Sequence, residues 1–335
     1  MSKPQFSLVM PVKNASALLE ESLMSVFSQS YKNFEVIVVD DASTDNSYEI
    51  AKKFKCKIVR LKESKKAAYA RNKGAERARG YFLVFMDSDI ILPRNTFMKA
   101  KEYIEKEREV SAFIGFFSEK MRFNNLPSQY KHLYLCYYYL KQGETLHTLD
   151  TSLTFIKRGI FNKFKFNTKI GYISEDTDLG MRLTKEGHII KQPRHITMEH
   201  AKYYSLISFF KTDFVRGKKF SQLFLKSLFK DKKESVKKTF YLRPINTYLS
   251  VGIMPLMVLS LLLSLFIKLF FPFFLLFLVA FIIVNFDFWS YLAKVRSTFF
   301  AFESVFIKFA DVFVMDLGIG ITALKFLFKR DRLFV

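Results

Sequence analysis

The chain has 335 residues, of which 50% are hydrophobic and 40 are phenylalanine, so it can form a sizeable core and is not wholly disordered. Its 12 glycines and 8 prolines are too few for a collagen-like or low-complexity chain. The 53 Lys and Arg residues against 31 Asp and Glu give a net charge of +22, which indicates an anionic partner: nucleotide phosphate, nucleic acid or anionic lipid. Cys56 and Cys136 lie far apart without metal-binding spacing, so the cysteines suggest neither a disulfide framework nor a zinc site.

The first 200 residues alternate short apolar runs with amphipathic stretches. The run Phe34–Val39 is rich in β-branched residues, as expected of a parallel strand that is buried on both faces. This alternation predicts a doubly wound α/β sheet, in which ligands bind where the parallel strands end. We expect strands over 6–11, 34–39, 57–61 and 81–86, and helices over 15–29 and 67–79.

Acidic clusters directly follow two of these strands. Asp40 and Asp41 come after the second strand, and Asp87 and Asp89 come after the fourth. Because neighbouring parallel strands end at one crevice, we expect the four carboxylates to share a site. A hard divalent cation such as Mg²⁺ or Mn²⁺ would relieve their mutual repulsion, since it takes one or two carboxylates plus substrate phosphate oxygens. The alternative is that these residues only cap helices or form turns.

The C-terminal part is dominated by Leu, Phe, Ile and Val. Tyr248–Ile267 is about 20 residues long and uncharged, which is the length that crosses a hydrocarbon core, and Pro272–Tyr291 follows after a short turn. The two predict a membrane-spanning hairpin. Thr298–Phe328 also contains charged residues that are costly at mid-bilayer, so we favour an interfacial or re-entrant helix there over a third span. These charged residues are Glu303, Lys308, Asp311 and Asp316.

Residues 203–229 interleave aromatic and basic side chains. Such a segment places apolar groups in the headgroup boundary and basic groups against anionic lipid; the alternative is an ordinary amphipathic helix packed on the domain. The N-terminus does not resemble a signal peptide, because its first apolar run is too short, so we expect the N-terminal domain in the cytoplasm. We divide the chain into a catalytic domain, 1–200, an amphipathic interfacial segment, 201–246, and a membrane domain, 247–335.

Five sequence blocks stand in a particular order within about the first 200 residues. They are Ser7-Leu-Val-Met-Pro-Val-Lys-Asn14, Glu35-Val-Ile-Val-Val-Asp-Asp-Ala-Ser-Thr-Asp45, Ala70-Arg-Asn-Lys-Gly74 with Ala78-Arg-Gly80, Phe85-Met-Asp-Ser-Asp89 and Glu175-Asp-Thr-Asp-Leu-Gly-Met-Arg182. Together they resemble the family 2 glycosyltransferases. The resemblance implies a GT-A fold, which is Rossmann-like with a mostly parallel sheet and helices on both faces. It also implies a nucleotide-sugar donor and inversion at the anomeric carbon.

The resemblance further implies a donor site at the ends of the predicted strands. Pro11 and Asn14 would close the first strand against the nucleotide, and Arg71 would lie near it. Asp40 and Asp41 would face the base and ribose. The residues that we expect to bind the nucleotide sugar are Pro11, Asn14, Asp40, Asp41, Arg71, Asp87 and Arg216.

A metal site is implied beside the donor. Asp87 and Asp89 stand in the family's DxD motif, whose second aspartate usually reaches the metal. His200 follows the apolar strand 196–198 and resembles the histidine that completes the metal site in many members; the alternative is a structural histidine. The implied cofactor is Mg²⁺ or Mn²⁺.

The fifth block implies the chemistry at the acceptor. Asp176 resembles the family's general base, which takes the proton of the acceptor hydroxyl, and Glu175 would support it. From the residues alone, the same block is also a capped helix start, with Ser174 as N-cap and Asp178 and Arg182 paired at i,i+4 spacing. Both interpretations can hold together.

We therefore expect a membrane-anchored, metal-dependent, inverting glycosyltransferase of hexosyltransferase type. It would move one sugar from a cytoplasmic nucleotide sugar to a lipid or lipid-linked acceptor, in the synthesis of a cell-envelope glycan or glycolipid. Phe214-Val-Arg216-Gly stands where processive relatives carry Gln-x-x-Arg-Trp, so long-polymer synthesis is not expected, although Arg216 can still hold diphosphate.

Two rival functions remain. A polyprenyl-phosphate glycosyltransferase of the dolichol-phosphate-mannose-synthase type is disfavoured by Glu175 and Asp176, because a phosphate acceptor needs no base. A catalytically silent membrane scaffold is disfavoured by the intact acidic blocks. Nucleic acid is not an expected partner, because no binding motif accompanies the positive charge.

Overall fold

The computed structural model describes residues 3–169, 175–229 and 245–328. The chain divides into two compact units: Met1–Arg122 with Gln142–Lys202, and Phe123–Lys141 with Tyr203–Val335. The sequence placed Phe123–Lys141 in the catalytic domain, whereas the structure groups it with the C-terminal helices. The proposed N-cap Ser174 and residues 230–244 of the interfacial segment lie outside the described residues.

The first unit is an α/β fold. Its elements in chain order are β1 (Phe6–Val12), α1 (Leu19–Phe27), β2 (Phe34–Asp40), α2 (Ser47–Lys52), β3 (Lys57–Arg60), α3 (Lys66–Glu76), β4 (Phe82–Met86), β5 (Ile90–Ile91), α4 (Thr96–Lys106), β6 (Ala112–Ile114), β7 (Phe116–Phe117), β8 (Thr145–Leu146), β9 (Leu153–Lys157), α6 (Arg158–Phe164), α7 (Glu175–Lys185), β10 (Ile190–Lys191) and β11 (Thr197–His200).

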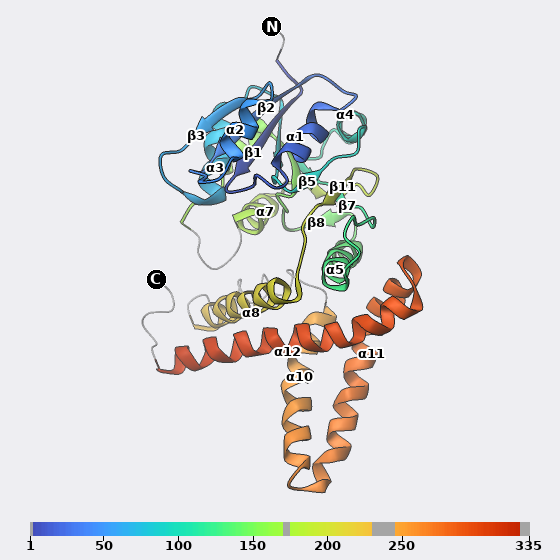
Figure 1. Ribbon diagram of the computed structural model, residues 1–335. Coiled ribbons are helices and arrows are strands. Elements are labelled where there is room, and N and C mark those ends of the chain that lie inside the picture. The colour runs from blue at the N-terminus through green and yellow to red at the C-terminus, as the bar shows by residue number, and fades with distance from the viewer. Residues whose placement is uncertain (1–2, 170–174, 230–244, 329–335) are drawn as a thin grey trace. The chain divides into compact units, whose positions relative to one another are not determined.

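An eight-stranded sheet forms the centre of this unit, in the order β3-β2-β1-β4-β9-β6-β10-β8. The strands β3, β2, β1 and β4 are parallel, and β9 runs antiparallel to both β4 and β6. Every residue of β4 is buried, as is every residue of β1 except Pro11, because helices cover the sheet on both faces (Figure 1). The predicted doubly wound α/β fold is confirmed, with antiparallel strands added beyond β4.

Helix α3 lies unusually close to the sheet because of Gly74. A Cβ atom at this position would stand 2.3 Å from Val9 Cγ1 and 3.0 Å from Val39 Cγ2, and the β-branched side chains have little freedom to move away. The helix backbone therefore rests directly on β1 and β2. This packing brings the first turns of α3, with Arg71, toward the edge where β1, β2 and β4 end.

A second, three-stranded sheet has the order β5-β11-β7. In it, β11 pairs antiparallel with β5, so that His200 lies opposite Ile90. This register carries His200 to the segment that directly follows Asp87 and Asp89.

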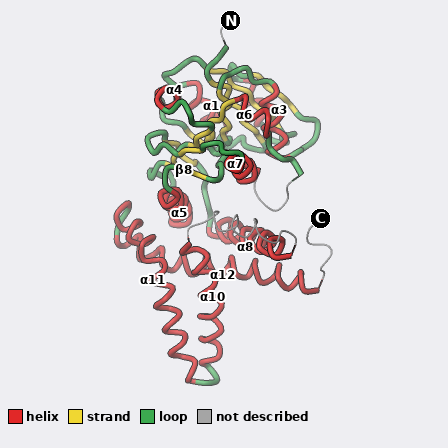
Figure 2. Tube along the Cα trace, turned by 180° about the vertical axis from the view of Figure 1, so that it is seen from behind, coloured by secondary structure: helices red, strands yellow, loops and turns green. Residues whose placement is uncertain are grey.

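The second unit is built from helices alone among its described residues (Figure 2). They are α5 (Leu126–Gln142), α8 (Leu206–Phe229), α10 (Ile245–Ser264), the short 3₁₀ helix η1 (Lys268–Phe270), α11 (Phe271–Val295) and α12 (Thr298–Phe328). Helices α10 and α11 form an antiparallel hairpin, in which buried Asn285 Nδ2 donates a hydrogen bond to Ser250 Oγ at 2.8 Å. Helix α12 runs across this hairpin and packs along α8 (Figure 1).

The hairpin helices are long and apolar enough to cross a membrane. The most apolar 18-residue windows of Ile245–Ser264 and Lys268–Val295 have mean hydropathies of 1.8 and 2.7, and most of each window faces away from the protein interior. Within the described residues, α12 does not pass the same test of length and composition. Instead it exposes a stripe of large apolar residues at helical spacing. This stripe consists of Phe299, Phe302, Phe306, Phe313, Leu317, Ile321, Leu324 and Phe328.

Candidate active site

A pocket of about 300 Å³ opens where β1, β2 and β4 end. It collects residues from four of the five sequence blocks, because neighbouring parallel strands end at the same edge of the sheet and α3 packs beside that edge. Of the predicted donor-site residues, Pro11, Asp41, Arg71 and Asp87 line it, whereas Asn14, Asp40 and Arg216 do not. The full lining is Pro11, Val12, Lys13, Asp41, Ala67, Arg71, Asp87, Ser88 and Asp89.

Asn14 and Asp40 hold the loops that border this pocket. Asn14 adopts a left-handed backbone conformation, with φ of 49°, and its Oδ1 accepts a hydrogen bond from the Thr44 backbone N–H at 2.9 Å. Asp40 is 1% exposed, and its Oδ1 accepts from the Ser43 backbone N–H at 3.0 Å. Asn14 therefore connects the loop after β1 to the loop after β2, and Asp40 fixes the loop after β2 to the end of its own strand.

Asp41 faces the pocket with a carboxylate that is already hydrogen-bonded. Its Oδ1 accepts from the Lys65 backbone N–H at 2.6 Å, and its Oδ2 accepts from Ser64 Oγ at 2.7 Å and from the Lys66 backbone N–H at 3.1 Å. These bonds cover backbone donors at the start of α3. In the described structure, the Asp41 carboxylate fixes the position of α3.

Arg71 joins the pocket to the first turn of α7. Its guanidinium donates from Nη2 to Asp87 Oδ1 and from Nη1 to Glu175 Oε1, both at 2.6 Å. The side chain is only 4% exposed, and its Nε has no hydrogen-bond partner among the described residues. A buried guanidinium needs anionic partners, so the two carboxylates hold it and are held by it. The first turns of α3 and α7 and the end of β4 thus form one network.

Asp87 and Asp89 differ in their electrostatic surroundings. Burial raises the pKa of Asp87 to about 6; the positive charge of Arg71 acts to lower it, and repulsion from Asp89 and Asp150 adds to the rise. The Asp87 side chain is nevertheless 35% exposed, on the side that faces the pocket. Burial also acts to raise the pKa of Asp89, but the hydrogen bond and charge of His200, together with Lys202, lower it overall. The His200 Nε2 to Asp89 Oδ2 distance is 3.3 Å.

The structure therefore brings the three predicted metal ligands into one neighbourhood. Asp89 contacts His200, and Asp87 and Asp89 repel each other. No three described His, Cys, Asp or Glu side chains are close enough to form a complete metal cluster. Two repelling carboxylates nonetheless fit a hard divalent cation, because such ions usually take only one or two protein carboxylates and complete their shell with water and substrate phosphate.

Asp176 lies in the first turn of α7 beside the loop that precedes β9. Its Oδ2 accepts long hydrogen bonds from Thr151, at 3.3 Å from the backbone N–H and 3.4 Å from Oγ1. Helix α7 approaches this loop closely because of Gly180, where a Cβ atom would stand 2.4 Å from the Leu149 backbone nitrogen. Asp178 instead pairs with Arg182 at 2.8 Å, which is the i,i+4 pair that the sequence predicts.

Arg216 belongs to the second unit. It lies in α8 and its Nη1 is 3.2 Å from Asp213 Oδ1, while Asp213 also pairs with the buried Lys131 of α5. Its role at the diphosphate stays a prediction.

The sequence reasoning assigned no role to Val12, Lys13, Ala67 and Ser88, which also line the pocket. Val12, Lys13 and Ser88 are adjacent in the sequence to predicted residues, so their position within the motif blocks could have placed them at this pocket. Ala67 lies outside every block. It could be found only from the packing of α3 on the sheet.

The first unit has the fold of a GT-A glycosyltransferase, with an acidic pocket at the ends of its parallel strands. The chain aligns with the mannosyltransferase PcManGT from Pyrobaculum calidifontis, solved in complex with GDP-Man and Mn²⁺, at a TM-score of 0.59 and 18% identity, over 99% of this chain and 89% of that one. Residues 7–164 match the family described as Glycosyl transferase family 2. The chain therefore carries a family 2 glycosyltransferase domain, as the motif blocks predict.

Curated relatives each match about a third of the chain. The putative teichuronic acid biosynthesis glycosyltransferase TuaG of Bacillus subtilis is 34% identical over 119 residues, which are 34% of this chain and 47% of the relative. The UDP-Glc:alpha-D-GlcNAc-diphosphoundecaprenol beta-1,3-glucosyltransferase WfaP of Escherichia coli is 31% identical over 117 residues, again 34% of this chain and 47% of the relative. The chain thus spans about half the length of these relatives.

Proposed function

We propose that this protein transfers one sugar from a nucleotide-sugar donor to a lipid or lipid-linked acceptor at the cytoplasmic face of a membrane, with inversion at the anomeric carbon. The observation that carries the proposal is the position of Arg71. One buried guanidinium contacts both Asp87, which lines the pocket at the strand ends, and Glu175, which is the direct neighbour of Asp176. The donor side and the acceptor side of a transfer reaction would meet at this residue.

The pocket at the strand ends would hold the nucleotide diphosphate. Arg71 and Lys13 supply positive charge there, and Lys13 is held by a hydrogen bond from its Nζ to the Ala42 carbonyl at 2.5 Å. PcManGT was solved with GDP-Man, and the name of WfaP specifies UDP-Glc; both are nucleotide-sugar donors. These names support the donor class.

Asp87 and Asp89, with His200 beside them, would hold Mg²⁺ or Mn²⁺. When bound, the cation supplies positive charge against the charge that develops on the departing diphosphate. His200 would orient Asp89 or join it as a ligand, because the two side chains already lie 3.3 Å apart.

Asp176 would act as the general base. It takes the proton of the acceptor hydroxyl as that oxygen attacks the anomeric carbon, while the bond from this carbon to the diphosphate breaks and its electron pair leaves with the nucleoside diphosphate. Attack from the face opposite the leaving group inverts the configuration. In the described structure, Asp176 Oδ2 accepts hydrogen bonds from Thr151, and its Oδ1 accepts one from the Thr177 backbone N–H at 2.7 Å.

The lipid nature of the acceptor is supported by the second unit. The α10–α11 hairpin is long and apolar enough to cross a membrane, and α8 carries basic and aromatic side chains. An enzyme held at a membrane meets its acceptor there. The name of WfaP specifies a diphosphoundecaprenol-linked acceptor, which is of this class.

The test is release of nucleoside diphosphate by the purified full chain in detergent, with UDP- and GDP-sugars, Mn²⁺ and a membrane lipid extract. We expect Asp176→Asn to lower the turnover rate by about 10² to 10⁴-fold, which is the usual contribution of general-base catalysis, and to leave donor affinity within a few-fold. Removal of the divalent cation with EDTA should abolish release.

Asp178→Asn is the matched control, because Asp178 lies in the same helical turn but pairs with Arg182. It should keep most of the activity. Full release in the Asp176→Asn variant with a polyprenyl phosphate as acceptor would instead identify the phosphate-acceptor reaction. Failure of every donor to react would contradict the proposed transferase activity.

A further inference from the structure

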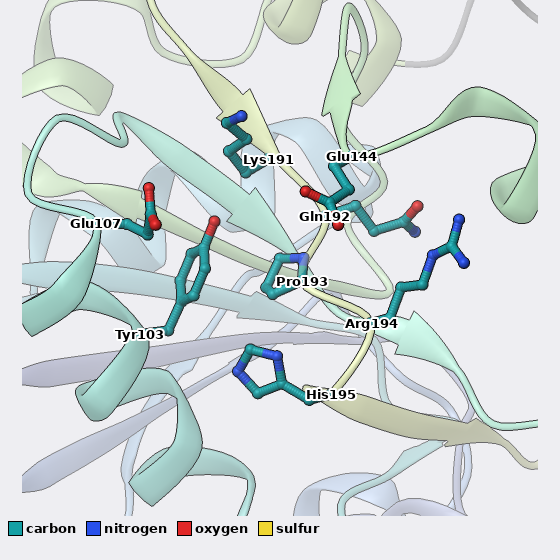
Figure 3. A pocket seen from close by; sticks show the side chains of 8 residues that line it. All are labelled: Tyr103, Glu107, Glu144, Lys191, Gln192, Pro193, Arg194 and His195. Atoms are coloured by element: carbon teal, nitrogen blue, oxygen red, sulfur yellow. The ribbon is translucent and has the colours of Figure 1, made fainter.

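A second cavity, of about 320 Å³, lies near β10 and β8, the last two strands of the eight-stranded sheet, away from the donor pocket at the ends of β1, β2 and β4. Figure 3 shows the side chains that line it. It is formed by the end of α4, the segment before β8 and the connection from β10 to β11. None of its residues belongs to the motif blocks of the transferase domain. Its lining is Tyr103, Glu107, Glu144, Lys191, Gln192, Pro193, Arg194 and His195.

Four charged side chains, two of each sign, face this cavity. Among the residues that the structure describes, Glu107, Glu144, Lys191 and Arg194 form no ion pair with one another or with any other side chain. Glu107, Glu144 and Arg194 are exposed, so the lining offers a ligand both hydrogen-bond acceptors and hydrogen-bond donors. The net charge of the lining is close to zero.

The cavity also has a fixed aromatic side. The rings of Tyr103 and His195 meet edge to face at 5.8 Å, and Lys99 Nζ holds the His195 carbonyl at 2.9 Å. Burial, and then the charges of Glu107 and Glu144, raise the pKa of Tyr103 to about 12, so its hydroxyl keeps its proton and can donate. Figure 3 shows the Tyr103 ring between Glu107 and His195.

Gln192 provides a further unused donor. The residue is only 2% exposed, and its Nε2 has no hydrogen-bond partner among the described residues. A buried amide without a partner is unfavourable, and a ligand or ordered water that accepts its hydrogen bond would offset that cost. The backbone here is fixed, because the Gln192 N–H donates to the Glu144 carbonyl at 2.8 Å.

We propose that this cavity binds a neutral saccharide unit, at a site separate from the donor pocket. Sugar hydroxyls both donate and accept, so one neutral ring can satisfy the carboxylates of Glu107 and Glu144 together with the cations of Lys191 and Arg194. Because positive and negative side chains are equal in number, the lining does not favour a ligand of either net charge. The volume lies at the lower end of the range for small-molecule sites, about 300–1,000 Å³, which suits one or two sugar rings.

This site goes beyond the proposed transfer reaction. It would hold a sugar of a glycan on the transferase domain without taking part in the chemistry at the donor pocket. Binding at the cavity can be measured without turnover, so it does not depend on whether the transfer reaction is correct.

The experiment is saturation-transfer NMR on the full chain, in a detergent without a sugar headgroup. The probes are glucose, galactose, mannose, N-acetylglucosamine, N-acetylgalactosamine and disaccharides of each, with inorganic phosphate and phosphocholine as charged competitors. We expect at least one saccharide to bind and the double variant Tyr103→Phe/Glu144→Gln to weaken it by about tenfold, which corresponds to about 1.4 kcal/mol. Circular dichroism should confirm that this variant is folded.

Glu102→Gln is the matched control, since Glu102 is an exposed residue of α4 that does not line the cavity. Binding should be unchanged in it and in Asp87→Asn, which alters only the donor pocket. Loss of binding in Asp87→Asn with full binding in the double variant would place the saccharide in the donor pocket and overturn the proposal. Binding of phosphate or phosphocholine alone, or of no probe, would also overturn it.

Discussion

Arg71 is the side chain on which the proposed transferase site depends most. It is buried, and its two partners come from the DxD segment and from the first turn of α7. A guanidinium can meet two carboxylates at once because its donors form a planar fork, which an ammonium group lacks. This geometry explains why the sequence places an arginine in the third motif block.

Arg71→Lys should therefore keep the charge but lose one of the two contacts. We expect the specificity constant kcat/KM for the donor to fall by about 100-fold, comparable to the loss of one preorganised hydrogen-bond donor. Thermal unfolding in detergent should show that the variant is folded. Wild-type kinetics in Arg71→Lys would mean that the bidentate contact is not needed for turnover.

Glu35 makes a different contribution, to the stability of the sheet. Its Oε1 accepts from Ser7 Oγ and from the Arg79 backbone N–H, both at 2.7 Å, and its Oε2 lies 2.8 Å from Lys57 Nζ. Burial acts to raise the pKa of Glu35, but the hydrogen bonds from Lys57, Ser7 and Arg79 outweigh it and lower the pKa below 4.5. The ionised form is therefore favoured by folding.

A carboxyl group whose pKa is lower in the folded than in the unfolded state stabilises the protein when the pH is above its unfolded-state pKa. This stability is lost as the pH falls through its folded-state pKa. We expect the thermal midpoint of the wild type to fall between about pH 5 and pH 3, and the drop to be smaller in Glu35→Gln. Thermal unfolding in detergent across this range measures both. Parallel curves for the two proteins would contradict the role of this carboxylate.

At the scale of elements, α8 and α12 cross with their backbones in contact. A Cβ atom at Gly217 would stand 2.0 Å from the Met315 carbonyl oxygen, and one at Gly318 would stand 2.3 Å from the Phe214 carbonyl oxygen. Gly217 of α8 and Gly318 of α12 thus each allow the two helix backbones to approach closely at the same crossing. Backbone atoms cannot move aside as side chains do, so larger residues must separate the helices.

Gly318→Leu should destabilise the second unit by about 1–3 kcal/mol, the usual effect of overpacking. Gly320→Leu is the control, because a Cβ atom at Gly320 meets nothing within 4 Å. The thermal midpoint in detergent should fall for the first variant only. Equal midpoints would show that the crossing relaxes freely.

The sequence predicted the strands around the pocket at the strand ends. The buried runs Phe34–Val39 and 81–86 became β2 and β4, because β-branched and aromatic runs between turn residues leave little choice of structure. The GT-A fold and the family are confirmed. The motif blocks also predicted several residues of the pocket at the strand ends, including Pro11, Arg71 and Asp87.

What the sequence could not predict depends on contacts between distant segments. The Asp41 carboxylate accepts hydrogen bonds from the start of α3, and no local sequence pattern predicts bonds to residues 23 to 25 positions away. The grouping of α5 with the C-terminal helices depends on buried tertiary contacts, such as Tyr130 to Asp311 at 3.2 Å. The cavity proposed to bind a saccharide likewise draws on three separate segments, none with a recognisable motif.

At the scale of the whole molecule, a hairpin that spans a membrane would determine which sides of it the chain reaches. If α10 and α11 span, the short connection η1 between them lies on the far side from the transferase domain. Leu269 in η1 is 73% exposed and Glu102 of α4 is also exposed, so each offers an accessible position for labelling.

We expect Leu269→Cys, in a Cys56→Ser/Cys136→Ala background, to react with a membrane-impermeant maleimide in intact cells. Glu102→Cys in the same background should react only after the membrane is opened. Labelling of both positions before lysis, or of neither, would contradict a spanning hairpin with a cytoplasmic transferase domain.

The shared position of Arg71 also bears on how the two substrates affect each other's affinity. A donor diphosphate that draws the Arg71 guanidinium toward Asp87 would weaken the contact between Arg71 and Glu175, next to the proposed base. An acceptor bound near Asp176 would act on the same guanidinium from the other side. Linkage requires this effect to be reciprocal: whatever factor the donor applies to acceptor affinity, the acceptor applies to donor affinity. The enzyme would then bind its substrates cooperatively, with one arginine setting the size of the effect.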